Sequence, residues 1–139
     1  MRAALRALFD LNVILDVLQR REPFYAMSAG ALASAETGQA EGLVAAHSLT
    51  TLFYLVARDQ SPDQARVILA DLLRFLTVAG VDAQVIEGAL NLPYRDFEDA
   101  VQMMAAVQAG ATHLITRNPQ DFRAGPLPVL QPAELVALL

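Results

Sequence analysis

The chain has 139 residues, 55% of them hydrophobic, with a formal net charge of −5 and no cysteine. This length supports one compact domain with a real core, and we expect residues 1–139 to form a single domain. The lack of cysteine excludes a disulfide framework and a thiolate metal site. The net acidity argues against a protein that holds nucleic acid by bulk attraction alone.

No apolar run reaches the roughly 18 to 20 residues that a membrane-spanning helix needs. The first ten residues also lack the pattern of a secretory signal. We therefore expect a soluble, cytoplasmic protein without a membrane segment. All ten basic residues are arginine, whose planar guanidinium suits bidentate phosphate contact. Any substrate phosphate would therefore be bound by arginine.

Strand and helix patterns alternate along the chain. Ser61 followed by Pro62, and Asp96 before an apolar helix, are helix start signals, and Gly110 is a stop signal. Pro23 and Ser48 likewise predict the first turn and the N-cap of two earlier helices. The predicted strands lie at 6–9, 41–46, 76–81 and 112–116, and the predicted helices at 12–21, 23–38, 48–58, 61–76, 82–92 and 96–110. Residues 128–139 add a last strand and a last helix.

Strands separated by helices predict right-handed crossovers and a mostly parallel sheet with helices on both faces. The expected class is α/β, as a three-layer α/β/α sandwich. The helix at 96–110 is apolar nearly all round, so we expect it to be buried. No internal repeat or linker interrupts this order.

Three acids are predicted to meet at one edge of this sheet, because ligands of open parallel sheets bind beyond the carboxyl ends of the strands. Asp10 follows the first strand, Asp121 follows the fourth, and Asp99 lies in the first turn of the helix before it. Clustered carboxylates need a proton or a cation, and hard oxygen ligands suit Mg²⁺ or Mn²⁺. With Asn12 and Asn118 beside them, these acids favour metal-assisted phosphodiester hydrolysis.

Each acid also has a purely structural interpretation. Asp10 could cap the helix that follows it, and Asp121 could cap a loop turn. Asp96 fits an N-cap better than a ligand, since Asp99 three residues later resembles a capping box. Ser48 has no histidine at a recognisable spacing, so it fits a helix cap and not a nucleophile. The arginines that flank the acids in sequence are the candidate phosphate contacts: Arg95, Arg117 and Arg123.

Two longer stretches carry a family resemblance. "FDLNVILDVL" is similar to the opening motif of PIN-domain proteins of the VapC-type toxin group, and "FEDAVQMMAAVQAGATHLITRN" resembles their second motif, with "NPQDF" as its loop ending. The resemblance covers nearly the whole chain. It implies a PIN-like α/β/α nuclease fold, a divalent-metal site and cleavage of single-stranded RNA. It also implies a homodimer and a small antitoxin protein as partner.

The resemblance transfers residue by residue. Asp10 matches the first metal-binding acid and Asp99 the acid at the start of the second motif. Asn12 and Thr116 match polar residues that organise the pocket, and Asn118 falls where many members have a fourth acid, with Asp121 nearest to it.

The family's glutamate after the second strand is missing, and Thr51 is the expected occupant of its position, as in a branch of the family that lacks it. Two fewer acids predict weaker metal affinity. Asp96 or Glu98 could compensate from the first turn of the same helix as Asp99.

Three functions remain open at this point. The first is a metal-dependent ribonuclease that acts as the toxin of a toxin–antitoxin pair, with Asp10 and Asp99 as metal ligands and Asp121 assisting. The second is a catalytically weakened module of the same fold that binds RNA or a protein without cutting. The third, a receiver-like phosphoryl acceptor at Asp10, is disfavoured because such a site calls for a lysine and the chain has none.

Overall fold

The structure is a computed structural model that describes residues 5–139. Its five strands form one sheet in the order β3-β2-β1-β4-β5, and all four pairings are parallel. The strands are β1 (Arg6–Phe9), β2 (Glu41–Ala45), β3 (Leu76–Ala79), β4 (His113–Ile115) and β5 (Val129–Leu130). The helices are α1 (Leu11–Leu18), α2 (Tyr25–Glu36), α3 (Ala46–Asp59), α4 (Pro62–Leu72), α5 (Ala83–Leu90), α6 (Phe97–Gln108) and α7 (Pro132–Leu138), with a 3₁₀ turn, η1, at Pro119–Phe122.

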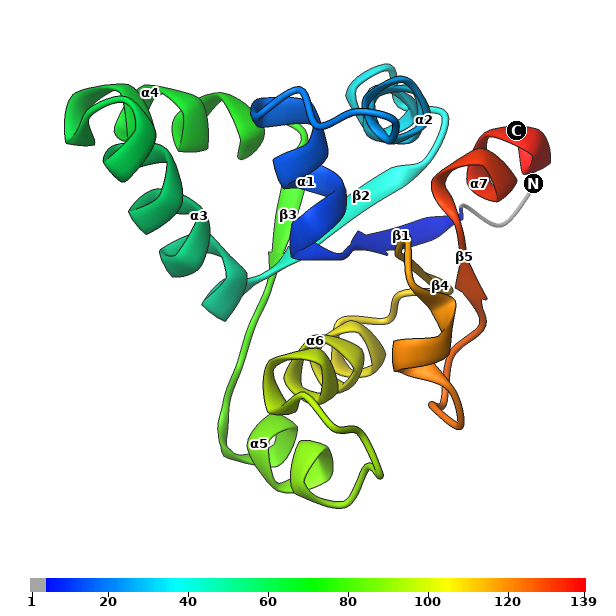
Figure 1. Cartoon of the computed structure of the whole chain (residues 1–139). Helices are drawn as coiled ribbons and strands as arrows, with labels where there is room; N and C mark the ends of the chain where they lie inside the picture. Colours follow the sequence, from blue (N-terminus) through cyan, green and yellow to red (C-terminus); the bar gives the residue numbers. More distant parts are fainter. Residues whose placement is uncertain (1–4) are drawn as a thin grey trace.

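Helices cover both faces of the sheet (Figure 1). Helices α5 and α6 lie on one side, and α1, α2, α3, α4 and α7 lie on the other. The strands alternate between the two cores, so that Phe9 packs with α1 and α2 while Leu8 packs with α5 and α6. This confirms the predicted α/β class with helices on both faces, and the sheet of the described residues is wholly parallel.

Local signals explain most helix starts. The Ser61 side chain accepts a hydrogen bond from the amide of Gln64 at 3.0 Å, with Pro62 at the first helical position of α4. Asp96 caps α6 as predicted, because its Oδ1 accepts from the amides of Glu98 at 2.8 Å and Asp99 at 3.3 Å. Asp96 thus removes two unpaired donors from the helix end.

Two predicted starts were wrong. Helix α3 begins at Ala46, immediately after β2, so the N-cap position falls on Ala45 and Ser48 lies buried inside the first turn. Helix α2 begins at Tyr25, which leaves Pro23 in the preceding turn. In both cases the chain direction set by β2 or by the α1–α2 connection overrode a local sequence signal.

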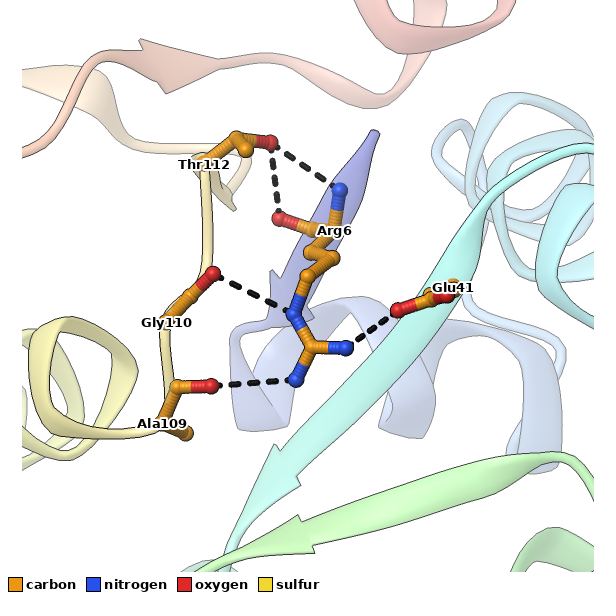
Figure 2. A network of polar contacts seen from close by, with 5 residues as sticks. All are labelled: Arg6, Glu41, Ala109, Gly110 and Thr112. Atoms are coloured by element: carbon orange, nitrogen blue, oxygen red, sulfur yellow. Dashed lines mark hydrogen bonds and ion pairs between the residues drawn. The ribbon is translucent and has the colours of Figure 1, made fainter. Parts of the chain in front are cut away.

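Arg6 ties the amino-terminal edge of the sheet together (Figure 2). Its guanidinium pairs with Glu41 of β2 and donates to the carbonyls of Ala109 at 3.0 Å and Gly110 at 3.2 Å, where α6 ends. Thr112 Oγ1 accepts from the backbone amide of Arg6 at 3.0 Å. A cation at a helix C-terminus satisfies its last carbonyls. This network fixes α6 from the edge opposite to Asp10.

None of the helices in the described part of the chain is both long and apolar enough to cross a bilayer.

Candidate active site

Asp10 occupies the N-cap position of α1, but its side chain makes no capping hydrogen bond. Both carboxylate oxygens are instead used across the sheet edge: Oδ1 accepts from Gln102 Nε2 at 2.9 Å, and Oδ2 accepts from Thr116 Oγ1 at 2.8 Å. The side chain is 3% exposed. The two side-chain hydrogen bonds show that Asp10 does more than cap α1, because it joins β1 to α6 and to the end of β4.

Gln102 of α6 is the centre of the site. Its Oε1 accepts from the amide of Leu11 at 3.2 Å and lies 3.5 Å from the hydroxyl of Ser48, which donates to it. Its Nε2 donates to Asp10 and, at 3.5 Å, to Oδ1 of Asp99. Since the two donors fix which end of the amide is oxygen, the nitrogen must face the acids. Gln102 therefore bridges the two carboxylates that the sequence predicts as metal ligands.

The electrostatics of the site oppose ionisation of both acids. Burial raises the pKa of Asp10, and the hydrogen bonds from Gln102 and Thr116 only partly offset this effect. For Asp99, partial burial comes first, and the negative charges of Asp96, Asp10 and Asp121 add to it, which raises the pKa to about 7. Burial and neighbouring negative charge therefore both favour the protonated form of Asp99.

Two pockets share Asp96 and Asp99. The inner pocket, about 100 Å³, is lined by Asp10, Leu11, Asn12, His47, Ser48, Asp96, Glu98, Asp99 and Gln102. The outer pocket, about 440 Å³, is lined by Pro93, Tyr94, Arg95, Asp96, Asp99, Gln120, Asp121 and Arg123. The predicted strand-end acids therefore lie around one continuous region at the carboxyl edge of the sheet.

The remaining pocket residues have different surroundings. Asn12 accepts from Arg21 Nη1 at 3.3 Å, beside the rim of the inner pocket. Thr116 is fully buried and also accepts from the backbone amide of Asn118 at 3.1 Å, which orients the start of η1. Thr51 is partly buried and lines neither the inner nor the outer pocket. The expected position of the missing glutamate thus lies outside both pockets.

The three candidate arginines separate into two groups. Arg95 and Arg123 are exposed and line the outer pocket. Arg117 points elsewhere: its Nε lies 2.7 Å from Oδ2 of the fully buried Asp16, and its guanidinium carbon lies 3.9 Å from the centre of the Phe24 ring. A guanidinium committed to a buried acid and an aromatic face is not free to bind phosphate. Arg117 therefore neutralises a buried acid of α1 on the face of the sheet that α1 and α2 cover.

The donor set fits a hard divalent cation. No group of three histidine or acidic side chains within residues 5–139 is arranged to hold a metal ion. Two carboxylates, Asp10 and Asp99, are nevertheless joined through one amide, and Mg²⁺ is commonly held by one or two carboxylates while it keeps several waters. The uncompensated charge around Asp99 is what a cation would neutralise.

Sequence reasoning missed two buried polar residues. Gln102 is 3% exposed, and the only available signal was a glutamine among buried apolar neighbours of α6. Asp16 is fully buried within α1, where it accepts from Ser28 Oγ at 2.9 Å and pairs with Arg117. Nothing in the local spacing distinguishes it from a surface acid.

The family model described as a PIN domain matches residues 6–120. The chain belongs to the PIN-domain family. That match includes Asp10, Asp99 and the whole of α6, and it ends inside η1, one residue before Asp121. None of the curated proteins compared with the chain matches its sequence.

Solved structures share the fold at low sequence identity. A chain of a toxin–antitoxin complex from Klebsiella pneumoniae is 22% identical with a TM-score of 0.71, covering 92% of this chain and 98% of that chain. A chain of VapBC2 from Rickettsia felis, bound to a promoter DNA fragment, is 16% identical with a TM-score of 0.65, covering 91% of this chain and 98% of that chain. The Sarcin–Ricin loop cleaving toxin VapC20 from Mycobacterium tuberculosis is 16% identical with a TM-score of 0.61, covering 78% of this chain and 86% of that chain. These similarities establish the VapC-like fold of the PIN domain.

Proposed function

We propose that this PIN domain is a metal-dependent endoribonuclease that cuts single-stranded RNA as the toxin of a toxin–antitoxin pair. The observation that carries the proposal is the pair of carboxylates, Asp10 and Asp99, bridged by Gln102 at the carboxyl edge of the sheet. The family match and the fold shared with toxins support the same class.

The residues divide the work as follows. Asp10 and Asp99 would hold Mg²⁺ or Mn²⁺, with Asp96 and Asp121 adding negative charge nearby. When bound, the cation supplies a Lewis acid that activates water and offsets charge developing at phosphorus. Gln102 and Thr116 keep Asp10 oriented and hydrogen-bonded, so that its geometry is set before substrate arrives. Arg95 and Arg123 would contact RNA phosphates from the outer pocket.

A cleavage assay tests the proposal. Purified protein is incubated with a fluorescently labelled single-stranded RNA and Mn²⁺, beside Asp10→Asn and the matched surface variant Asp63→Asn in α4. We expect the wild type and Asp63→Asn to cut at the same rate and Asp10→Asn to lose about 100-fold or more. The ribonuclease proposal would be refuted if RNA stays intact with every protein, or if Asp10→Asn cuts it as fast as the wild type.

The second candidate is a non-cutting module of the same fold. The absence of a three-acid group in the described part of the chain favours it, as does the missing glutamate after the second strand. Isothermal titration separates the two candidates: the nuclease binds Mn²⁺ at millimolar or lower concentration, whereas the non-cutting module gives no saturable heat.

The partner proposals follow from the relatives. One of the similar structures is a toxin–antitoxin complex, a second is VapBC2 bound to DNA, and a third is FitAB bound to DNA. We propose a small antitoxin as a partner for this chain, and a homodimer on the resemblance to VapC-type toxins. Where a small open reading frame lies beside the gene for this chain, its co-expression should suppress growth inhibition by this protein. Light scattering of the purified protein should give twice the mass of one chain.

A further inference from the structure

The outer pocket has the size and walls of a small-molecule site. Its volume of about 440 Å³ falls within the range of roughly 300 to 1,000 Å³ found for ligand pockets. One wall comes from the segment between α5 and α6, with Pro93, Tyr94 and Arg95, and the other from η1 and the residue after it. Asp96 and Asp99, at the start of α6, also line it.

The walls are held in place by packing. Tyr94 Oη donates to the carbonyl of Phe122 at 2.9 Å, and the two rings meet edge to face with centres 5.9 Å apart. Phe122 is 2% exposed. A Cβ atom at Gly125 would lie 2.2 Å from Tyr94 Oη and 2.7 Å from the Met103 methyl, so only glycine allows this approach. The pocket is therefore preformed between two segments about 28 residues apart in sequence.

Its chemistry combines three kinds of contact. Arg95 and Arg123 are exposed and make no ion pair within residues 5–139, so both guanidinium groups are available for phosphate. Pro93 and Tyr94 supply apolar and aromatic surface. Gln120 and Asp121 supply polar oxygens on the opposite wall, and Asp121 is exposed. A ligand that needs all three is a nucleotide, with its phosphate, its flat base and its hydrogen-bonding edge.

We propose that the outer pocket binds one nucleotide of a single-stranded RNA, and that Asp121 selects guanine there. The Watson–Crick edge of guanine presents two neighbouring N–H groups, N1–H and N2–H, which one carboxylate can accept together. Adenine and cytosine offer one amino group each and uracil offers one ring N–H, so none of them can use both oxygens in this way. Asp121 is thereby a residue that reads the substrate, beside the acids that would hold the cation.

The proposal rests on the proposed ribonuclease only in its use of RNA, because the pocket itself can be tested without cutting. Its place next to Asp99 puts a bound guanosine beside the reacting phosphate. The nuclease would therefore cut next to guanosine more often than next to other nucleosides.

Binding in EDTA tests the pocket directly. Guanosine, adenosine, cytidine and uridine 5′-monophosphates are titrated into the wild type and followed by NMR amide shifts, with a non-cleavable 2′-deoxy UGU trinucleotide as a second probe. We expect guanosine monophosphate to bind about tenfold or more tightly than the others, with shifts at residues 93–96 and 120–123. The trinucleotide should bind more tightly still, because it has two phosphates and each can contact one of the two arginines.

Variants separate the contacts. Asp121→Ala should remove the guanine preference, whereas Arg123→Gln should weaken all four nucleotides by a similar factor and keep their order. The exposed acid Asp63, changed to alanine in α4, is the matched control and should bind like the wild type. Equal affinity for the four nucleotides, or an unchanged preference in Asp121→Ala, would overturn the proposal.

Three further outcomes keep this proposal distinct from the ribonuclease. If guanosine monophosphate binds as tightly as the trinucleotide, the pocket serves a free nucleotide and the reading of a strand is refuted. If the pocket prefers guanine but the protein cuts no RNA with Mn²⁺, the ribonuclease fails and the nucleotide site stands. If RNA is cut without any guanine preference, the ribonuclease stands and the nucleotide site fails.

Discussion

Changing Gln102 to glutamate should convert a bridge between two acids into a third acid at the same place. The substitution keeps the length of the side chain and the oxygen that accepts from Leu11 and Ser48. It replaces the Nε2 donor, which lies 2.9 Å from Asp10, with a second oxygen. The carboxylate of Asp10 then loses one of its two hydrogen bonds and gains a like charge in a buried site.

The expected cost can be worked out from these contacts. A hydrogen bond to a charged group contributes about 1.5–3 kcal/mol, and like-charge repulsion in a buried position adds a similar amount. The free energy of unfolding should fall by about 3–5 kcal/mol at pH 8, which lowers the melting temperature by on the order of 10 °C. At pH 5 the added carboxyl is partly protonated and can donate again, so the loss should be smaller.

Thermal unfolding by circular dichroism, with and without 1 mM Mn²⁺, measures both effects. Mn²⁺ should raise the melting temperature of Gln102→Glu more than that of the wild type, because the third carboxylate adds a ligand for the cation. Gln84→Glu, at an exposed position in the first turn of α5, is the matched control and should shift stability by less than about 0.5 kcal/mol. A Gln102→Glu protein as stable as the wild type at pH 8, and unaffected by Mn²⁺, would refute the bridging role.

Further predictions concern the stability of the folded chain. Because the pKa of Asp99 is raised to about 7 in the folded protein, protonation of this carboxyl favours folding. The free energy of unfolding, measured by urea titration, should therefore fall as pH rises from about 4 to 7 and level off above pH 7. Asp99→Asn should reduce this dependence on pH. Arg6→Ala should cost about 1–3 kcal/mol in chemical unfolding, since it removes the donors to the carbonyls of Ala109 and Gly110 after α6. Arg74→Ala, with an exposed pair at 3.9 Å, should cost less than about 0.5 kcal/mol. Asp16→Asn should lower the free energy of unfolding by about 3–5 kcal/mol, because it leaves the largely buried guanidinium of Arg117 unpaired. The control Asp59→Asn, at an exposed position, should change it by less than about 0.5 kcal/mol. Equal losses of stability at the two positions would contradict the role of the buried pair.

The sequence predicts the layout of this PIN domain well because its signals are local. Strand β1 lies where it was predicted, at Arg6–Phe9, and Asp96 caps α6 with the spacing that its sequence shows. Parallel strands then bring Asp10 and the end of β4 to one edge by geometry alone. Helix boundaries that depend on the preceding strand were harder to predict. Helix α3 begins at Ala46, directly after β2, so Ser48 lies within the first turn and not at the N-cap position.

The contacts inside the site could not be predicted, because they join distant parts of the chain. Gln102 reaches Asp10 across 92 residues, and helix periodicity does not show which buried side a polar residue faces. Arg117 illustrates the opposite error: its place beside the acids in sequence favoured a phosphate contact, but it forms an ion pair with the buried Asp16 of α1. Both outcomes depend on packing between elements and not on spacing within one.

The central claim is that Asp10 and Asp99 hold the cation that enables RNA cleavage. The most direct measurement compares two titrations of the wild type under the same buffer: Mn²⁺ binding by calorimetry, and the rate of RNA cleavage at each Mn²⁺ concentration. We expect both curves to saturate with the same midpoint and both to disappear in Asp10→Asn. Cleavage that persists in EDTA, or Mn²⁺ binding that survives unchanged in Asp10→Asn, would contradict the claim.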